Sequence, residues 1–432
     1  MSSIIPSVGL DIGTTKVAVV VAATDALTHR VDVIGAGLAD CDGLKRGVVT
    51  NITKTADAIR QAVDQAEQKS GYSIGRVIVG VAGDHVATSS TKAIVTVSAN
   101  EITQTDIRRL HHELAQVRIT PDRRILHVIP QDYVIDGQDG ISDPLGMSGK
   151  RLEAIGLVVT ASASAVENIY RCADRAGLDI DAVVLQPLAS AYSVLDDAEK
   201  EVGVAIVDIG GGTTDVAVFK NNVLRFASIV SVAGQKVTDD IMTVLAIRNV
   251  DAERIKRDHG HADGESIMRD DVFQVPGVAG RTPTELTKSV LCQIIEPRVE
   301  EIYELVLQRL MESQWAHQLS AGVVITGGSS MLRGSAALAT RVFRMPVAIG
   351  VPRGFSSEGL AKEVSSPMYA TAVGLAMYGI RHSADLEAQP TAEHAPSGAV
   401  SSRGSESTVV GTQQPDDKKG FLGKVKDWFE NL

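Results

Sequence analysis

Two segments of the chain share one order of apolar and polar positions. Residues 8–23 are VGLDIGTTKVAVVVAA, and residues 203–219 are GVAIVDIGGGTTDVAVF. In each, an apolar run precedes Asp-Ile-Gly, a Thr-Thr pair and a second run rich in valine. Short apolar runs separated by a glycine turn predict two antiparallel strands. The repeat therefore predicts a duplicated α/β fold with two similar lobes.

Between these hairpins the apolar spacing changes from strand to helix periodicity and back. It predicts strands at residues 77–81, 93–97, 127–135 and 154–160, and helices at residues 105–117 and 165–176. Thr103 or Thr105 is expected to cap the first helix, because a threonine side chain can accept from a free backbone N–H. No catalytic constellation stands out in this segment.

A further helix is predicted near the end of the second half. Residues 286–310 are LTKSVLCQIIEPRVEEIYELVLQRL. Pro297 is expected to kink or interrupt this helix, because proline lacks the N–H that the helix needs.

The last fifteen residues, KKGFLGKVKDWFENL, predict a short amphipathic helix. Its apolar stripe and the two flanking lysines are Phe421, Leu422, Val425, Trp428, Phe429 and Leu432, with Lys424 and Lys426. Residues 383–417 before it are rich in Ser, Gly, Pro, Ala and Glu, which predicts a disordered tether. The helix could dock on its own domain or in a partner's groove, but the tether favours an interfacial membrane anchor.

Composition narrows the classes of partner. A net charge of −11 and a pI of about 5.4 disfavour a nucleic-acid binder, which needs a basic face. The three cysteines have no metal-ligand spacing, which indicates buried or idle thiols in a reducing compartment. There is no apolar run near 18 residues and no signal-peptide pattern. We therefore expect a cytoplasmic protein whose membrane contact is peripheral.

The two hairpins carry the residue types that hold a polyphosphate. Glycine lets backbone N–H groups approach phosphate oxygens, and the hydroxyls of both Thr-Thr pairs can donate to them. Asp11 and Asp208 stand at strand ends, where they could hold the waters of a magnesium ion. Lys16 can add a positive charge. One such hairpin is usually only a turn, but two matching hairpins indicate a nucleotide held between lobes.

A third glycine pair occurs in AGVVITGGSSMLRG, residues 321–334. The segment predicts a strand, a turn and a helix start, which can place N–H groups near a ribose or α-phosphate. It could also be an ordinary loop between a strand and a helix.

These motifs, in this order, resemble the actin-like ATPase superfamily, whose duplicated fold is ribonuclease H-like. The corresponding segments are the first phosphate loop at residues 11–16, a connecting helix at 186–195, the second phosphate loop at 208–215, an adenosine loop at 326–334 and a second connecting helix at 369–379. Small residues such as Ala189, Ala191, Ala372 and Gly374 would let the two connecting helices pack closely. The resemblance implies that ATP and Mg²⁺ are bound.

Within the superfamily the chain most resembles the FtsA family of bacterial division proteins, over residues 5–382 and the tail. The resemblance rests on GLDIGTTKVAVVV, VDVIGAGLADCDGLKRGVVTNI, IIEPRVEEIYELV and the terminal helix after a variable linker. It implies the following divisions: residues 1–83 and 162–194 for the first lobe core, 84–161 for an inserted interaction subdomain, 195–229 and 306–382 for the second lobe core, 230–305 for a subdomain contacting nucleotide and partner, 383–417 for the linker and 418–432 for the membrane-targeting helix.

The resemblance also implies roles for individual residues. The nucleotide-binding set would be Asp11, Gly13, Thr14, Thr15, Lys16, Asp208, Gly210, Gly211, Gly212, Thr213, Thr214, Asp215, Gly234, Lys236, Glu253, Lys256, Gly327, Gly328, Ser329 and Met331. Gln186 could orient an attacking water, and Lys288 and Arg298 would receive the acidic C-terminal peptide of FtsZ. Either of these two basic residues could instead be a solvated charge on a helix face.

The implied function is a division protein at the cytoplasmic face of the inner membrane, at the division site. It would bind ATP, polymerise on the membrane and tether FtsZ filaments to the membrane through the terminal helix. It would bind later division proteins through the inserted subdomain. The nucleotide would be mainly structural, with weak ATPase activity at most. The alternative is a soluble sugar-type kinase of the same fold, which needs a carboxylate base that the sequence does not identify.

Overall fold

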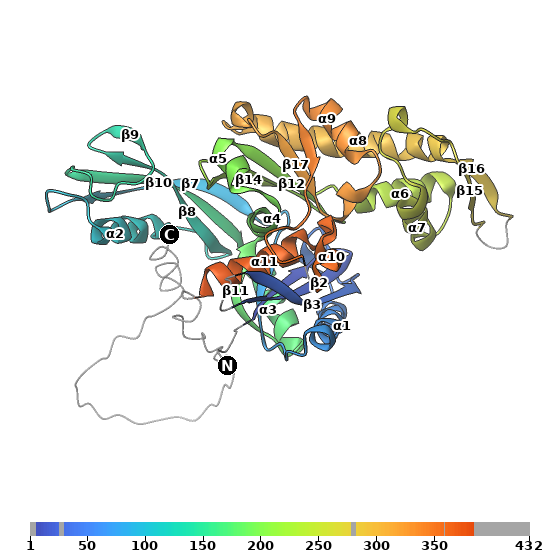
Figure 1. Cartoon of the computed structure of the whole chain (residues 1–432), viewed down its shortest axis with the longest axis horizontal. Coiled ribbons are helices and arrows are strands. Elements are labelled where there is room, and N and C mark those ends of the chain that lie inside the picture. Colours follow the sequence, from blue (N-terminus) through green and yellow to red (C-terminus); the bar gives the residue numbers. More distant parts are fainter. Residues whose placement is uncertain (1–5, 26–29, 278–281, 358, 384–432) are drawn as a thin grey trace, which may run out of the picture.

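The computed structural model describes residues 6–25, 30–277, 282–357 and 359–383. These residues form two lobes, one above the other in Figure 1, with a third group of strands at the left. The expected membrane-targeting helix and, apart from Ser383, the expected linker lie outside the described residues.

Lobe 1 is built on a five-stranded sheet with the order β11-β6-β1-β2-β3. Neighbouring strands β1, β2 and β3 are antiparallel, whereas β6 runs parallel to both β1 and β11. The bounds of the elements in this lobe are β1 Ser7–Ile12, β2 Lys16–Thr24, β3 Val31–Asp40, β4 Leu44–Lys45, β5 Val48–Val49, α1 Ile52–Ser70, β6 Arg76–Val81, α3 Ala163–Arg175 and β11 Asp179–Leu185.

Lobe 2 repeats this arrangement. Its sheet has the order β14-β13-β12-β17-β18, again with three antiparallel strands followed by two parallel ones. The strands are β12 Val204–Ile209, β13 Thr214–Lys220, β14 Val223–Val230, β17 Val323–Thr326 and β18 Val347–Ile349. The predicted duplication is therefore confirmed, and each predicted hairpin forms the central pair of one sheet.

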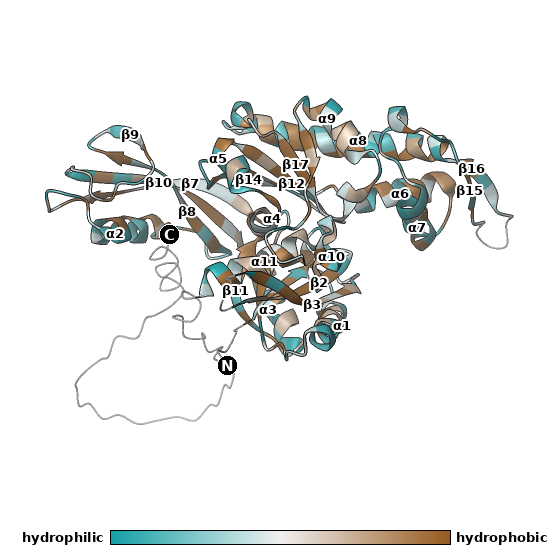
Figure 2. Ribbon diagram, in the orientation of Figure 1, coloured by the Kyte–Doolittle hydropathy of each residue, from teal (hydrophilic) through white to brown (hydrophobic). Residues whose placement is uncertain are grey.

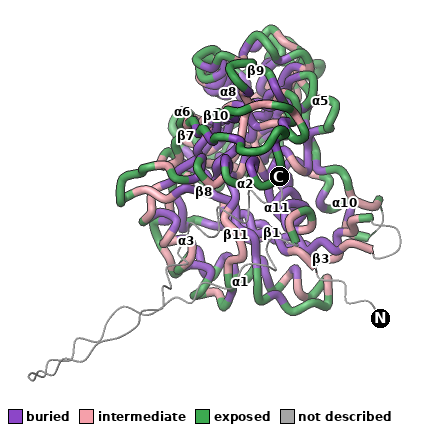
Figure 3. The backbone as a smooth tube through the Cα atoms, turned by 90° about the vertical axis from the view of Figure 1, so that its left-hand side faces the viewer, coloured by how far each residue is buried: buried purple, intermediate pink, exposed green. Residues whose placement is uncertain are grey.

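Two helices, α4 (Gln186–Val194) and α11 (Ala370–Arg381), lie between the lobes and pack on each other (Figure 1). Their close contact requires a small residue, because a Cβ added to Gly374 would collide with the carbonyl oxygen of Ala189. The predicted packing of two connecting helices is confirmed. Most residues of both helices are buried, and Figure 3 shows α11 within the buried interior, coloured purple.

The inserted subdomain, defined here as residues 87–162, has its own sheet in the order β7-β10-β8-β9. Its elements are β7 Ala87–Thr96, α2 Gln104–Ala115, β8 Arg123–Ile135, β9 Gln138–Ile141 and β10 Arg151–Ser162. Thr103 caps α2 in a capping box with Asp106, so it takes the role that was expected of Thr103 or Thr105. Strand β9 was not predicted, because three of its four residues are exposed and it lacks an apolar run.

The outer part of lobe 2 carries helices and a small hairpin. The elements are α6 Gly234–Leu245, α7 Asn249–His259, β15 Val272–Val275, β16 Thr284–Thr287 and α8 Lys288–Glu312. Helix α8 crosses the expected division between residues 305 and 306. It also runs without interruption through Pro297, so an interruption there is wrong. Burial of Ile295, Val299 and Ile302 in the lobe core on both sides of the proline offsets the lost hydrogen bond.

The remaining elements are short connections: α5 Asp197–Val202, α9 Ser335–Phe343, α10 Ala361–Val364 and the 3-10 turns Gly264–Ser266, Ala316–Gln318, Gly328–Met331 and Pro367–Tyr369. Hydropathy follows the layers, with apolar strands inside and polar helix faces outside (Figure 2). Within the described ranges, no helix has the length and apolar character needed to cross a bilayer.

Candidate functional site

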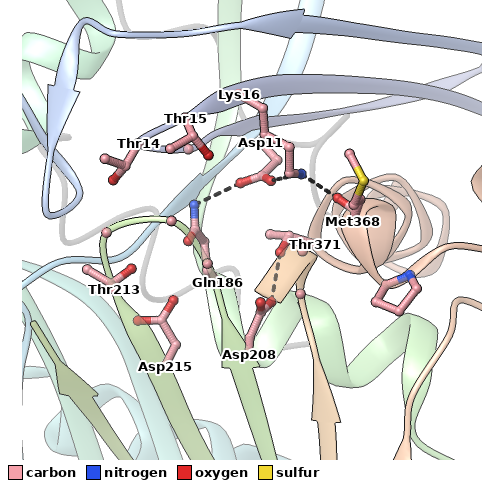
Figure 4. Close-up of a pocket in the computed structure, with 17 residues that line it drawn as sticks. Asp11, Thr14, Thr15, Lys16, Gln186, Asp208, Thr213, Asp215, Met368 and Thr371 are labelled. Carbon is pink, nitrogen blue, oxygen red and sulfur yellow. Dashed lines mark hydrogen bonds and ion pairs between the residues drawn. The ribbon is translucent and has the colours of Figure 1, made fainter. Parts of the chain in front are cut away.

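A pocket lies between the lobes, where the two central hairpins meet (Figure 4). Its walls come from both lobes and from the start of α11. The lining residues are Asp11, Gly13, Thr14, Thr15, Lys16, Gln186, Asp208, Gly210, Gly211, Gly212, Thr213, Asp215, Gly327, Gly328, Pro367, Met368 and Thr371.

The turns of the two hairpins face each other across this pocket. A Cβ added to Gly211 would lie 2.5 Å from Cγ2 of Thr15, and one added to Gly212 would collide with Thr14. A larger residue at either position would push the lobes apart. The glycines thus permit the close approach of two loops whose N–H groups and hydroxyls are suited to phosphate oxygens.

On the lobe 1 side, Asp11 is held by two neighbours. Gln186 donates from Nε2 to Asp11 Oδ1 at 3.0 Å, and Lys16 Nζ lies 3.4 Å from Asp11 Oδ2. Lys16 also donates to the carbonyl of Met368, so it links the hairpin of lobe 1 to the turn that precedes α11 (Figure 4). The pocket's lysine is therefore shared between a carboxylate and a carbonyl.

On the lobe 2 side, Asp208 is held by the two connecting helices. Ser190 of α4 donates to Asp208 Oδ2 at 2.7 Å, and Thr371 of α11 donates to the same oxygen at 3.1 Å. Burial raises the pKa of the Asp208 carboxyl, and the nearby Asp11 carboxylate raises it further. The two hydroxyls and Lys16 act in the opposite direction because they stabilise the ionised form.

Asp215 is the most deeply buried of the three acids that line the pocket. It is 3% exposed, and its Oδ1 is buried without a hydrogen-bond partner among the described residues. Burial raises the pKa of Asp215 well above its ordinary value, and the carboxylates of Asp208 and Asp11 add to the effect. An orphaned carboxylate oxygen beside two other acids is suited to a hard cation or to a hydrogen-bonded water.

The third glycine pair completes the same site. Gly327 and Gly328 line the pocket, and Ser329 donates to the carbonyl of Gly210 at 2.8 Å. The N–H of Gly234 donates to this carbonyl as well, at 3.1 Å. The third loop and the start of α6 are thereby fixed to the second hairpin.

Several predicted site residues lie behind or beside the pocket rather than in its lining. Thr214 is buried and donates to the carbonyl of Val232. Lys256 donates to the carbonyl of Gly234 at 3.1 Å and pairs with Glu253 at 2.6 Å. Two further predicted residues, Lys236 and Met331, are exposed. Lys236 forms an ion pair with Asp239, and the sulfur of Met331 accepts a weak hydrogen bond from Ser366.

The two predicted partner-binding residues lie on α8, away from the pocket lining, and both have ion-pair partners. Lys288 pairs with Asp271 at 2.6 Å. Arg298 pairs with Asp240 through Nε at 2.6 Å and also contacts Glu301. Both side chains are partly exposed as well as ion-paired, so partner binding and a solvated charge on the helix face both stay predictions.

Sequence reasoning missed four residues that shape the pocket: Ser190, Pro367, Met368 and Thr371. The signal for two of them was present, since Ser190 and Thr371 are hydroxyl residues inside the two small-residue helices. A buried hydroxyl on a helix between lobes needs a hydrogen-bond acceptor. The contribution of Met368 is a backbone carbonyl, which side-chain identity does not indicate.

Comparison with known proteins identifies relatives over most of the chain. The family model described as Cell division protein FtsA matches residues 205–374, and the model described as SHS2 domain inserted in FTSA matches residues 83–160. Cell division protein FtsA of Pseudomonas aeruginosa is 43% identical over 378 residues, covering 88% of this chain and 90% of that protein. The protein of the same name from Escherichia coli K12 is 38% identical over 397 residues, covering 89% and 94%.

Solved structures with a similar fold include the PilM-PilN type IV pilus biogenesis complex, with a TM-score of 0.63 and 16% identity over 88% of this chain and 99% of the other. MreB5 of Spiroplasma citri bound to ADP has a TM-score of 0.55 and 15% identity, over 89% and 99%. These likenesses show an actin-like fold, as predicted.

The buried acid of the pocket makes stability depend on pH. Because the pKa of Asp215 is raised in the folded state, the contribution of its protonated carboxyl to the free energy of unfolding is fully present below the ordinary pKa of aspartate. This contribution is lost as the pH rises through the folded-state pKa. Between the ordinary and the folded-state pKa, the free energy of unfolding falls by about 1.4 kcal/mol per pH unit. At pH 7 we expect the free energy of unfolding of Asp215→Asn to exceed that of the wild type by about 1 kcal/mol or more. Near pH 4 the difference is expected to be smaller.

Denaturant unfolding across this pH range measures the effect. Asp57→Asn, at an exposed aspartate on α1, is the matched control and is expected to show no such trend. A difference between Asp215→Asn and the wild type that stays constant with pH would contradict the assignment.

Proposed function

This chain belongs to the FtsA family of cell division proteins, and we propose that it binds ATP between its lobes, polymerises on the cytoplasmic membrane and tethers FtsZ filaments there. The single observation that carries the nucleotide part is the convergence of two facing glycine hairpins and a third glycine loop on one pocket. The membrane and FtsZ parts rest on family membership and on the pattern of the tail. The sugar-kinase alternative is not favoured, because the matching relatives are division proteins.

The pocket residues fit a polyphosphate with its cation. In the proposed complex, the loops at residues 11–16 and 208–215 surround the phosphates and Lys16 turns from the Met368 carbonyl toward them. The third glycine loop lies at the ribose side, and Glu253 and Lys256 support the start of α6 beneath the nucleoside. Two related structures, of MreB5 from Spiroplasma citri, are described as bound to ADP and to AMPPNP, which supports a nucleotide in this fold.

Magnesium is proposed to bind mainly through water and phosphate oxygens. Asp11 and Asp208 contribute oxygen atoms from opposite lobes, and Asp215 has the unpartnered oxygen. Among the residues that the structure covers, no group of three His, Cys, Asp or Glu side chains is arranged to enclose a metal. Mg²⁺ commonly keeps several waters and only one or two carboxylates, so this donor set fits it.

Hydrolysis is proposed to be weak. Gln186 donates its amide N–H to Asp11, so its carbonyl oxygen is the atom with which it could orient a water. The nucleotide would then act chiefly by joining the two lobes and favouring the conformation that polymerises.

Membrane attachment is proposed to run through residues 418–432. Single-helix binding at an interface is reversible, but a filament presents many such helices at once, so avidity would strengthen attachment. The inserted subdomain is proposed to meet later division proteins, and Lys288 and Arg298 to exchange their internal carboxylate partners for those of the FtsZ peptide.

Nucleotide binding is tested by replacing the pocket lysine. We expect Lys16→Ala to weaken ATP binding by about tenfold or more, because a hydrogen bond to a charged group contributes about 1.5–3 kcal/mol. Isothermal titration with Mg-ATP measures the change. Lys54→Ala is the control, since Lys54 pairs with Asp42 at the surface. Equal affinities for the wild type and Lys16→Ala would refute this assignment.

Membrane attachment is tested on the apolar stripe. We expect Trp428→Glu to lower the fraction of protein that sediments with anionic lipid vesicles by about tenfold, because it removes a large apolar side chain and adds a repelled charge. Asn431→Glu adds the same charge outside the apolar stripe and should retain most binding. If Trp428→Glu still sediments like the wild type, the helix is not the anchor.

FtsZ binding is tested on α8. Reversing the charge in Arg298→Glu is expected to weaken binding of an acidic FtsZ tail peptide by about tenfold, through repulsion at the contact. Arg309→Glu reverses a charge on the same helix, where Arg309 pairs with Glu312, and should leave the affinity unchanged. Fluorescence anisotropy of a labelled peptide distinguishes the two, and an unaltered affinity in Arg298→Glu would exclude this site.

A further inference from the structure

The inserted subdomain is connected to lobe 1 through the chain at both of its ends, but it also packs against lobe 2. Its chain follows β6 and leads into α3, both in lobe 1, yet β7 and β8 lie beside β14 of lobe 2 (Figure 1). Thr88 on β7 donates to the carbonyl of Ala227 at 3.2 Å, and Gln131 on β8 donates to the carbonyl of Leu224 at 2.7 Å. Any change in the angle between the lobes must therefore disturb this contact.

A buried arginine lies at the centre of the contact. Arg225 on β14 is 6% exposed and donates from Nη1 to the carbonyl of Gln131 at 2.9 Å and to Asp132 Oδ2 at 2.7 Å. Its Nε donates to Lys220 O in its own lobe, and its guanidinium lies 5.0 Å from the ring centre of Trp315. A buried cation that loses its carboxylate is strongly destabilising. Separation of Asp132 from Arg225 is thus opposed by the charge as well as by the hydrogen bonds.

Apolar packing joins the inserted subdomain, lobe 2 and helix α4. Ile129 and Val159 of the inserted subdomain share one buried cluster with Leu224 of lobe 2 and with Ala191 and Val194 of α4. The contact is therefore part of the core around α4.

The inserted subdomain also reaches the backbone beside the pocket. The Nε2 of His127 accepts a hydrogen bond from the N–H of Leu185 at 3.0 Å. Complete burial lowers the pKa of His127 to about 4, which leaves the ring neutral and able to accept. The next residue, Gln186, donates to Asp11, and Ser190 on the same helix donates to Asp208. The subdomain thus contacts the helix that holds an acid of each lobe.

We propose that the inserted subdomain is a brace between the lobes, in which Arg225 positions lobe 2 and so controls how long the pocket retains its nucleotide. This inference rests on the proposed nucleotide site. It assigns Arg225 a positioning role, since Arg225 does not line the pocket. A macromolecule bound to the inserted subdomain would then alter nucleotide retention by straining or supporting this brace.

The test combines two measurements on the full chain carrying Asp132→Ala, Arg225→Ala or both. Loss of the brace is expected to speed the release of a fluorescent ATP analogue by about fivefold or more, the size of a typical coupling between sites. Without nucleotide, hydrogen exchange is expected to rise in β14, β8 and the start of α4. Because both substitutions remove the same contact, the fold-increase in release rate of the double variant should be smaller than the product of the fold-increases of the two single variants.

Controls separate the brace from general destabilisation. Arg76→Ala removes an ion pair with Asp181 that lies within lobe 1, so it should leave both readouts at wild-type values. If Arg225→Ala fails to fold, Gln131→Ala removes the hydrogen bond to Leu224, together with a longer one of 3.4 Å to the carbonyl of Ile129 in its own strand, and is expected to give a smaller change of the same kind.

The outcomes distinguish this inference from the function on which it rests. Wild-type release rates in folded variants, or independent effects of Asp132→Ala and Arg225→Ala, would overturn the brace while leaving nucleotide binding intact. Absence of ATP binding in the wild type would contradict the proposed function, and the exchange measurement would still decide the brace: unchanged exchange in β14 and α4 would overturn it.

Discussion

The structure depends on the close approach of two glycine turns that bring three carboxylates to one pocket. Asp11 and Asp208 are the second-to-last residues of β1 and β12, and Asp215 is the second residue of β13. Because Gly211 and Gly212 lack side chains, the turns can face Thr14 and Thr15 across a narrow gap. The cost is a cluster of acids with one lysine, Lys16, in the lining. A cation and phosphates bound at such a site would stabilise the folded protein.

The connecting helices turn this local chemistry into a property of the whole molecule. Helix α4 provides Gln186 to Asp11 and Ser190 to Asp208, while α11 provides Thr371 to Asp208. Because Gly374 lacks a side chain, α11 packs directly against α4 between the lobes. Through the contact of His127 with Leu185, and of Arg225 with Asp132, the inserted subdomain joins the same mechanical unit. The pocket, the two lobes and the inserted subdomain are thereby joined through direct contacts.

Much of the fold and of the pocket could be predicted from local pattern. The two hairpins, the connecting helices and the third glycine loop have strong local signals, and the structure forms each of them near its predicted position. Pro297 shows where local rules fail, because tertiary burial keeps α8 continuous through a residue that normally disrupts a helix. Thr214 illustrates the same limit: its hydroxyl is turned toward Val232, which the Thr-Thr pair alone does not indicate.

Local sequence was enough to predict the duplicated hairpins, the acids near their strand ends and the amphipathic character of the tail, since each depends on residues close together in the chain. Three other features became visible only in the folded chain: Ser190 and Thr371 donate to one carboxylate, Lys16 reaches the Met368 carbonyl, and the inserted subdomain contacts lobe 2. These contacts join residues far apart in the chain. Their geometry follows from how the lobes and helices pack, and no periodicity along the sequence encodes it.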